Sequence, residues 1–477
     1  MVVILDTTLR EGELQPGVYF TRESRIALGR ALAEVGTPRI EVPIIYPSRG
    51  GKIEDVKDAV TEIEQNYTAS IAVLHARVLK EDIELANSYD ATGCAIYMAP
   101  TGLHRREKFH GMERQKIIER FVSALEFMKS CGFTYRRASV EDASRFALPE
   151  EKSEEDTQEF LHNLLNAIQD AGATHISIPD TIGMLPLTRC IPFVKSVTAM
   201  VDIPIACHFH NDYGNALANA IQASMIPGVE EINVSIMGLG TRNGITDHYE
   251  FVANLEDLYG ISTGEKREKM RWLYNIFIEE TGIPSPLTHP LSPQCFVEKA
   301  GTHQSQVVKD PTGYIPRMKL KYDAIDGVRF EAGQLMSKQV VTKLFDGHNI
   351  HQEKIIDITN TIAARSALRK REISPWEVKD IIHAKSGIDL PIETINKVIR
   401  GSDLAYIMLS LKPQVSTPEL LKEVMQWKEV ERIDEVYGDV DVILLSRIND
   451  FEGNAVVDKI RHRFKDMLIK TVTLPIE

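Results

Sequence analysis

Eight short apolar runs, separated by stretches of helical periodicity, occupy the first 240 residues and restrict the fold more than any other feature of this sequence. Between them lie segments such as SRIALGRALAEVG (24–36), in which apolar residues recur every three to four positions before a closing glycine. The runs are VVILDTT (2–8), RIEVPI (39–44), SIAVLH (70–75), GCAIYMA (93–99), YRRASVE (135–141), HISIPDT (175–181), IPIACHFH (203–210) and EINVSIMG (231–238). Continuous apolar runs are typical of parallel strands buried on both faces. Eight such strands alternating with helices over about 260 residues predict a (β/α)8, or TIM, barrel.

The main alternative is an open, doubly wound sheet, but no GxGxxG segment follows the first run. Polar side chains also gather near the C-terminal ends of the runs. They are Asp6, Glu41, His75, Glu141, Asp180, His208 and His210. In a barrel these ends converge on one face, which is where active sites are built. We therefore predict a catalytic barrel over residues 1–280, with its site at that face.

The rest of the chain predicts two further domains. A proline-rich linker at 282–293 leads into mixed helical segments up to residue 403, one of which starts at Ser374-Pro375. We expect residues 281–403 to form a mainly helical subdomain. Residues 404–477 alternate strand and helix patterns in the order βαββαβ, which is a ferredoxin-like plan.

Charge and cysteine content narrow the possible partners and location. The net charge of −13 argues against a nucleic-acid partner bound through its phosphates. The five cysteines are scattered, without a CxxC pair, so a reducing cytosol is the simpler interpretation. There is no basic-then-apolar leader and no apolar segment long enough for a membrane helix. We expect a cytoplasmic protein without a membrane partner.

The segment HFH at the end of the seventh run predicts a metal site. His208 and His210 point to one face of the strand, because side chains alternate along a strand. Glu11, just after the first run, can reach the same end of the barrel and supply a third ligand. Two imidazoles and one carboxylate with open positions suit Mg, Mn, Zn or Co. The alternative is a hydrogen-bonded histidine pair without an ion.

Two more segments carry residues suited to catalysis. Arg10 places a permanent cation beside Glu11, where it can stabilise a ketone oxygen that becomes an alkoxide. Arg137, Ser139 and Glu141 alternate along RASVED (137–142) and so face the barrel interior together. The first two can hold a carboxylate, and Glu141 can serve in acid–base chemistry. Structural ion pairs are the alternative for both segments.

Seven ordered segments resemble the DRE-type TIM-barrel metallolyase superfamily, in its Claisen-condensing branch of homocitrate, 2-isopropylmalate and citramalate synthases. They are DTTLREGE (6–13), REKFHG (106–111), RASVED (137–142), PDTIGMLP (179–186), HFHNDYGNALANA (208–220), GLGTRNGI (238–245) and KAGTHQ (299–304). GLGTRNG separates this branch from the HMG-CoA lyase branch, whose cysteine-containing loop does not occur in this sequence. A lyase acting in the reverse direction is the weaker alternative.

The resemblance implies roles for individual residues. Glu11, His208 and His210 would bind a divalent metal. Arg10 would bind the 2-oxo acid, with Thr181 nearby. His75, at the end of the third run, is a further candidate substrate-binding residue. His303 would cross from a partner subunit and, with Glu141, deprotonate the methyl group of acetyl-CoA. This arrangement would require a domain-swapped homodimer or a larger homo-oligomer in which residues 281–403 complete the partner's site.

The identity of the acceptor follows from the same resemblance. R-x-S-x-E-D is similar to the homocitrate synthase version, in which the arginine and serine bind the distal carboxylate of 2-oxoglutarate. We therefore expect a dicarboxylic acceptor; the alternatives are 2-isopropylmalate, citramalate or Re-type citrate synthase activity, or a non-catalytic regulatory homologue. Departures from the family pattern occur at Leu14, Thr241 and Glu298. Leu79 is expected to replace a histidine that contacts the substrate.

Residues 404–477 resemble the ligand-sensing module of Lrp/AsnC regulators, which is related to ACT domains. The most similar stretch is VYGDVDVILL (436–445), with Gly438 and Asp441 as the candidate effector-binding residues. The resemblance implies feedback control by a pathway amino acid such as lysine. A dimerisation module without a ligand is the alternative.

Overall fold

Eight parallel strands form a closed barrel in which each strand pairs with the next in sequence and the last pairs with the first. The strands are β1 (Val3–Asp6), β2 (Arg39–Val42), β3 (Ile71–Arg77), β4 (Gly93–Met98), β5 (Tyr135–Val140), β6 (His175–Asp180), β7 (Ile205–Phe209) and β8 (Val229–Val234). Each falls within one of the eight apolar runs or overlaps it. The computed structural model describes residues 2–315, 327–401, 404–413, 417–427, 429–447 and 454–475. The predicted (β/α)8 fold is confirmed.

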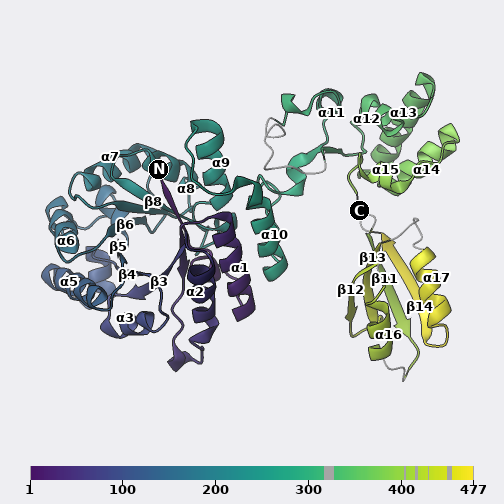
Figure 1. Cartoon of the computed structure of the whole chain (residues 1–477). Coiled ribbons are helices and arrows are strands. Elements are labelled where there is room, and N and C mark those ends of the chain that lie inside the picture. Colours follow the sequence, from purple (N-terminus) through teal and green to yellow (C-terminus); the bar gives the residue numbers. More distant parts are fainter. Residues whose placement is uncertain are drawn as a thin grey trace. The chain divides into compact units, whose positions relative to one another are not determined.

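Helices surround this ring of strands (Figure 1). They are α1 (Arg22–Val35), α2 (Glu54–Asn66), α3 (Lys80–Asn87), α4 (Gly102–Glu107), α5 (Arg114–Ser130), α6 (Gln158–Asp170), α7 (Leu187–Thr198), α8 (Ala216–Ser224), α9 (His248–Tyr259) and α10 (Met270–Thr281). For α1, the local sequence explains where the helix begins and where it ends. The Thr21 hydroxyl accepts the N–H of Ser24 at the start of α1, and Gly36 ends that helix at a φ of 99°.

The core of this unit has two layers. Most apolar side chains lie between the strands and the helices, where Leu28, Phe121 and Leu164 are fully buried. Inside the barrel, Leu5, Val73, Ala95 and Tyr135 form a small separate cluster. Polar side chains occupy the remaining interior. The barrel is therefore a filled core that supports a polar layer, as expected for this fold.

The chain divides into two compact units, Met1–Leu291 and Ser292–Glu477. The second unit begins with mainly helical structure that has its own core, including Val341, Ile358 and Ile382. Its elements are β9 (Val297–Glu298), α11 (Gly301–Val307), β10 (Arg329–Phe330), α12 (Lys338–Leu344), α13 (Gln352–Arg369), α14 (Pro375–Ser386) and α15 (Ile392–Asn396). Helix α14 begins at Pro375, as the sequence predicts, and Ser374 caps it in a capping box with Glu377.

The last part of the second unit contains a four-stranded antiparallel sheet in the order β12-β13-β11-β14. Its elements are β11 (Leu404–Leu411), α16 (Thr417–Val424), β12 (Val430–Glu435), β13 (Val442–Arg447), α17 (Asn454–Arg463) and β14 (Leu468–Pro475). This βαββαβ arrangement is the predicted ferredoxin-like plan. The predicted domain limits at residues 280 and 403 stay predictions, and residue 403 lies outside the described residues.

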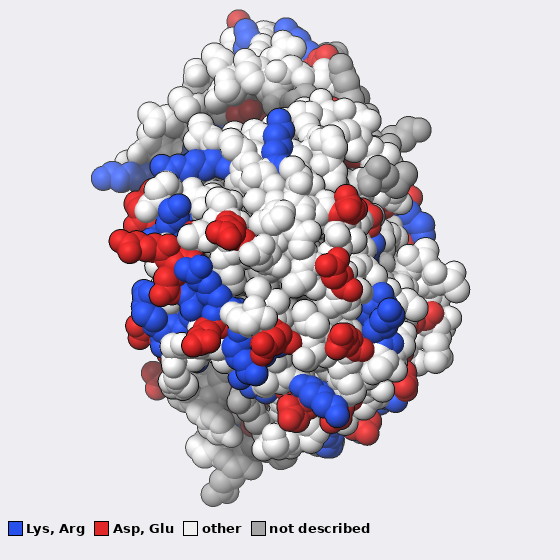
Figure 2. All heavy atoms as spheres, turned by 90° about the vertical axis from the view of Figure 1, so that its left-hand side faces the viewer, with Lys and Arg blue, Asp and Glu red and all other residues white. Residues whose placement is uncertain are grey.

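The surface carries both signs of charge. Acidic and basic side chains are intermixed on the face that Figure 2 shows. Within the described ranges, no helix combines the length and the apolar character needed to cross a membrane. The predicted cytoplasmic location and the predicted absence of nucleic-acid and membrane partners stay predictions.

A buried ion-paired histidine joins β1 to the start of α9. His248 is fully buried, with Nδ1 2.9 Å from Asp6 Oδ2 and Nε2 2.9 Å from Glu265 Oε2. Burial alone would lower the pKa of His248, but the carboxylates of Glu265 and Asp6 raise it to about 10. The imidazole is therefore held as a cation between two carboxylates.

We predict that His248→Gln destabilises the barrel in a pH-dependent way. A histidine whose pKa is raised on folding stabilises the protein fully below its unfolded pKa of about 6.5, and this contribution is lost as the pH rises through about 10. The loss of unfolding free energy in the variant should be about 3 kcal/mol near pH 6 and shrink toward pH 10. Urea denaturation of both proteins across this pH range measures it. Parallel stability curves would contradict the assignment, and exposed His162→Gln is the control.

Candidate active site

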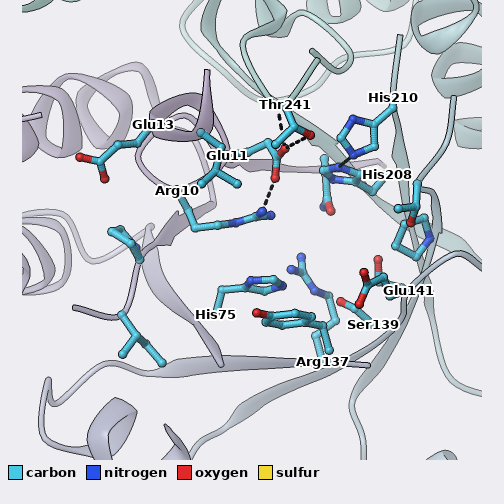
Figure 3. A pocket seen from close by; sticks show the side chains of 18 of the residues that line it. Arg10, Glu11, Glu13, His75, Arg137, Ser139, Glu141, His208, His210 and Thr241 are labelled. Atoms are coloured by element: carbon cyan, nitrogen blue, oxygen red, sulfur yellow. Dashed lines mark hydrogen bonds and ion pairs between the residues drawn. The ribbon is translucent and has the colours of Figure 1, made fainter. Parts of the chain in front are cut away.

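A cavity of about 470 Å³ opens where the C-terminal ends of the barrel strands meet, and its residues converge as Figure 3 shows. All of the site residues predicted within the barrel line this cavity. They are Arg10, Glu11, His75, Arg137, Ser139, Glu141, Thr181, His208 and His210. The sequence therefore located the candidate site, although the roles assigned to these residues stay predictions.

Glu11, His208 and His210 form one compact group of potential metal ligands. Their ligand atoms all lie within 4.8 Å of one another, and all three side chains are buried. His208 Nε2 and His210 Nε2 are 3.3 Å apart. The alternation of β7 brings the two imidazoles to the same side, and the loop after β1 brings Glu11 to them.

The electrostatics of this group fit a divalent cation. Burial lowers the pKa of His208 to about 3 and also lowers the pKa of His210, so both imidazoles are neutral, which is the form that binds metals. His210 Nδ1 is buried and has no hydrogen-bond partner. Burial alone would raise the pKa of Glu11, but the nearby Arg10 guanidinium, together with the hydrogen bond from the Thr241 backbone N–H, lowers it to about 2. An ionised carboxylate beside two neutral imidazoles is a suitable donor set.

Arg10 lies between two carboxylates. Its guanidinium pairs with Glu11, and its Nε is 2.7 Å from Glu41 Oε2. The other Glu11 oxygen accepts hydrogen bonds from Thr241, at 3.2 Å from the backbone N–H and 3.3 Å from the hydroxyl. Thr241, which departs from the family pattern, thus still helps to hold Glu11 in place.

Arg137 lines the cavity floor but already has two partners. Its guanidinium pairs with Glu41 on β2, and its Nη1 is 2.8 Å from Glu231 Oε1 on β8. Arg137 is only 1% exposed. Although burial opposes a charged arginine, these carboxylates raise its pKa. The positive charge that the sequence assigns to a substrate carboxylate is thus balanced within the protein.

The remaining barrel candidates surround the same space. Lys108 Nζ lies 3.2 and 3.3 Å from the two oxygens of Glu141. Thr181 accepts the backbone N–H of Asp142 through its hydroxyl at 2.8 Å. His75 stacks on Tyr97 with the ring centroids 4.5 Å apart, and burial together with the Arg10 cation lowers its pKa to about 3. His75 is therefore neutral and can donate or accept a hydrogen bond.

The other predicted functional residues belong to the second unit. His303 lies on α11, with its side chain 42% exposed and stacked on Tyr314. Gly438 and Asp441 lie in the loop between β12 and β13, and one Asp441 carboxylate oxygen accepts the Leu411 N–H at 2.6 Å. Their catalytic and effector-binding roles stay predictions.

One predicted residue lies outside the cavity, and sequence reasoning overlooked others that lie in or beside it. Leu79 precedes α3 and lines a groove between α3 and α5 rather than the barrel cavity, and the expectation that it replaces a substrate-contacting histidine stays a prediction. The overlooked residues are Tyr97, Glu231 and Asn233. Asn233 follows Glu231 by two positions on β8, and this spacing in the sequence indicates a shared face with the other interior residues.

Residues 1–276 match the family model described as HMGL-like. The chain belongs to the HMGL-like family. This HMGL-like protein is 27% identical over 468 residues to homocitrate synthase of Saccharolobus islandicus (strain L.S.2.15 / Lassen #1), which covers 96% of both chains. It is 31% identical over 317 residues to homocitrate synthase AksA of Methanopyrus kandleri, which covers 66% of this chain and 75% of that protein.

Solved structures agree with the HMGL-like fold. The HMG-CoA lyase of Bacillus subtilis superposes with a TM-score of 0.52 at 22% identity, over 60% of this chain and 95% of that chain. The HMG-CoA lyase of Acinetobacter baumannii, solved with coenzyme A and 3-methylmalate, gives a TM-score of 0.51 at 19% identity, over 60% of this chain and 93% of that chain. These likenesses concern the fold alone. The predicted family and barrel are confirmed.

We predict that the purified protein binds a divalent ion through Glu11, His208 and His210. His208→Ala should weaken the binding of Mn²⁺ by more than about 100-fold. Substituting residues that only hydrogen-bond to a metal ligand already lowers metal affinity by about 10–100-fold, and the loss of a ligand itself should cost more. Titration calorimetry on chelator-treated protein measures this affinity. His175→Gln is the control. His175 is also buried, but it lies at the N-terminal end of β6 and pairs with Glu230 rather than with the predicted metal ligands. Equal Mn²⁺ affinity in wild type and His208→Ala would remove the ligand assignment.

Proposed function

We propose that this protein is an acyltransferase that condenses acetyl-CoA with a 2-oxo acid and releases CoA, as a homocitrate synthase does. The observation that carries the proposal is the placement of Arg10 and Glu11 beside His208 and His210 at the barrel mouth. Relatives named homocitrate synthase, aligned over 96% of both chains, support the same chemistry.

Glu11, His208 and His210 would hold the divalent ion. When bound there, the ion supplies a Lewis acid for the ketone and carboxylate of the 2-oxo acid. Arg10 adds a permanent positive charge at the same place. Since Glu11 and Glu41 fix its guanidinium, the cation is positioned before the reaction and stabilises the ketone oxygen as it becomes an alkoxide. Ser139 and Thr181 add hydroxyl groups that orient the acceptor.

Carbon–carbon bond formation requires a base. Glu141, acting with His303 of a partner subunit, removes a proton from the methyl group of acetyl-CoA. The resulting enolate carbon attacks the ketone carbon of the acceptor, and the alkoxide that forms takes up a proton. Water then hydrolyses the thioester, which yields a carboxylate and the free thiol of CoA. In this scheme, the domain-swapped homodimer is needed to complete each site.

The acceptor that we propose is dicarboxylic, with 2-oxoglutarate first. The name of the curated relatives supports this choice. Oxaloacetate, pyruvate and 2-oxoisovalerate correspond to the citrate, citramalate and 2-isopropylmalate alternatives. The metal remains one of Mg, Mn, Zn or Co.

A thiol-release screen with acetyl-CoA and each of these four acceptors tests the proposal. CoA release that depends on a 2-oxo acid and on a divalent ion is the expected result. Release of CoA without any acceptor would indicate thioester hydrolysis alone. A lyase would instead split the condensed acyl-CoA. An ion-loaded protein that is inactive with every acceptor would favour the regulatory homologue.

We predict that Arg10→Gln lowers kcat/KM by at least about 1,000-fold, because it removes a fixed cation from the developing alkoxide. Mn²⁺ binding should persist, since the three ligands remain. Steady-state kinetics and calorimetry on the same sample separate these two effects. Arg22→Gln is the matched control, because Arg22 is an exposed arginine that pairs with Asp58 on the outer helices. Near-normal turnover in Arg10→Gln would refute the role of the cation.

We further propose that the module at residues 404–477 binds an amino acid such as lysine and controls the barrel. Addition of the effector should lower the rate of CoA release and produce a heat of binding. Asp441→Asn should weaken that binding, whereas Asp434→Asn on the neighbouring strand should not. Titration with the twenty amino acids without any heat would favour a dimerisation module instead.

A further inference from the structure

The buried carboxylate of Glu231 lies outside the lining of the cavity and accepts four hydrogen bonds. One of its oxygens accepts Arg137 Nη1 and Asn233 Nδ2, both at 2.8 Å. The other accepts Arg39 Nη1 at 2.7 Å and the Tyr135 hydroxyl at 2.6 Å. Glu231 is fully buried. The four donors therefore fix this negative charge in one place.

Arg137 belongs to the lining of the cavity, where Figure 3 shows it near Ser139 and His75, whereas Glu231 is not part of that lining. Its second partner, Glu41, also pairs with Arg10. Two buried carboxylates thus contact Arg137, and each is shared with a second arginine, Glu41 with Arg10 and Glu231 with Arg39. Neither carboxylate lines the cavity, whereas the guanidinium does. Charges interact strongly in such a buried layer because little solvent screens them.

The cations that line the described cavity are all paired. Arg10 pairs with Glu11 and Glu41, and Arg242 lies 2.8 Å from Asp212. Arg137, with Ser139 on the same strand, is the group expected to receive the distal end of the acceptor. A second carboxylate on the acceptor would have to share the Arg137 guanidinium with Glu231. An acceptor with an uncharged distal end meets no such competition.

We propose that Glu231 is a specificity-determining residue that acts through Arg137, by limiting the positive charge that the cavity floor offers to the distal end of the 2-oxo acid. The inference rests on the proposed condensation. Glu231 does not touch the acceptor and is a positioning residue. Its removal should favour dicarboxylic over monocarboxylic acceptors, while the metal group and Arg10 stay as they are.

Two nearby carboxylates show why Glu231 is the informative position. Glu41 contacts both Arg10 and Arg137, so its substitution would disturb the catalytic cation as well. Glu230, next in sequence, pairs with Arg39 at 2.7 Å and with His175 at 3.0 Å, and these contacts do not include Arg137. Glu230→Gln therefore removes a carboxylate from the same strand without touching the cavity floor. It is the matched control for Glu231→Gln.

The test compares kcat/KM for 2-oxoglutarate and oxaloacetate with that for pyruvate and 2-oxoisovalerate, in wild type, Glu231→Gln and Glu230→Gln. We expect the dicarboxylic-to-monocarboxylic ratio to rise at least about tenfold in Glu231→Gln, a modest change for a buried charge pair. The change should come through a lower KM for the dicarboxylic acceptors. The ratio in Glu230→Gln should equal that of wild type. A purely structural role would instead change kcat for all acceptors alike.

Each other outcome has a defined meaning. An unchanged ratio in Glu231→Gln, a shift toward monocarboxylic acceptors, or the same shift in Glu230→Gln overturns the inference alone. A wild-type protein that releases no CoA with any acceptor overturns the proposed function, and the inference with it. If circular dichroism shows that Glu231→Gln is unfolded, Glu231→Asp is measured instead. That change keeps the charge but withdraws it from Arg137, so the ratio should shift in the same direction.

Discussion

The position of the Arg10 guanidinium between Glu11 and Glu41 is the interaction on which the site depends. It joins a potential metal ligand to a carboxylate that is buried inside the barrel. It keeps Glu11 ionised beside two neutral imidazoles, since the arginine offsets the effect of burial on the carboxylate. The same contact places a permanent cation next to the group that would hold a divalent ion. The contacts of Arg10 therefore fix three things together: the charge of Glu11, the position of Glu11 and the position of the guanidinium itself.

The buried layer beneath this contact explains how the barrel tolerates so many charges. Removing an ion from water costs several kcal/mol, which is recovered only if each charge has partners of good geometry. Glu41 joins Arg10 to Arg137, and Arg137 joins Glu41 to Glu231. Tyr135 and Asn233 fill the remaining acceptor positions of Glu231. The result is a connected chain of ion pairs between strands. Arg137 is the member of this chain of ion pairs through which the proposed role of Glu231 would reach the acceptor.

The HMGL-like family and the homocitrate synthase relatives fit this chemistry, and the structure adds detail that concerns selectivity rather than the reaction itself. Similarity of sequence predicted Arg137 and Ser139 as ligands of a distal carboxylate. The structure adds that the Arg137 guanidinium also pairs with two acidic side chains. On the proposed role of Glu231, the choice of acceptor depends on the competition between substrate and protein for the Arg137 cation.

Sequence alone determined the fold class and the composition of the site. Apolar runs separated by helical periods specify eight strands, and the two-residue period of a strand places His208 with His210, and Arg137 with Ser139, on shared faces. Local sequence does not determine which strands meet across the closed barrel. Arg39 and Glu231 are 192 positions apart, yet their side chains form an ion pair because closure brings β2 near β8. The partners of Arg137 and the outward position of Leu79 were likewise decided by the tertiary structure, because they depend on strand register and barrel closure rather than on the residues nearby in sequence.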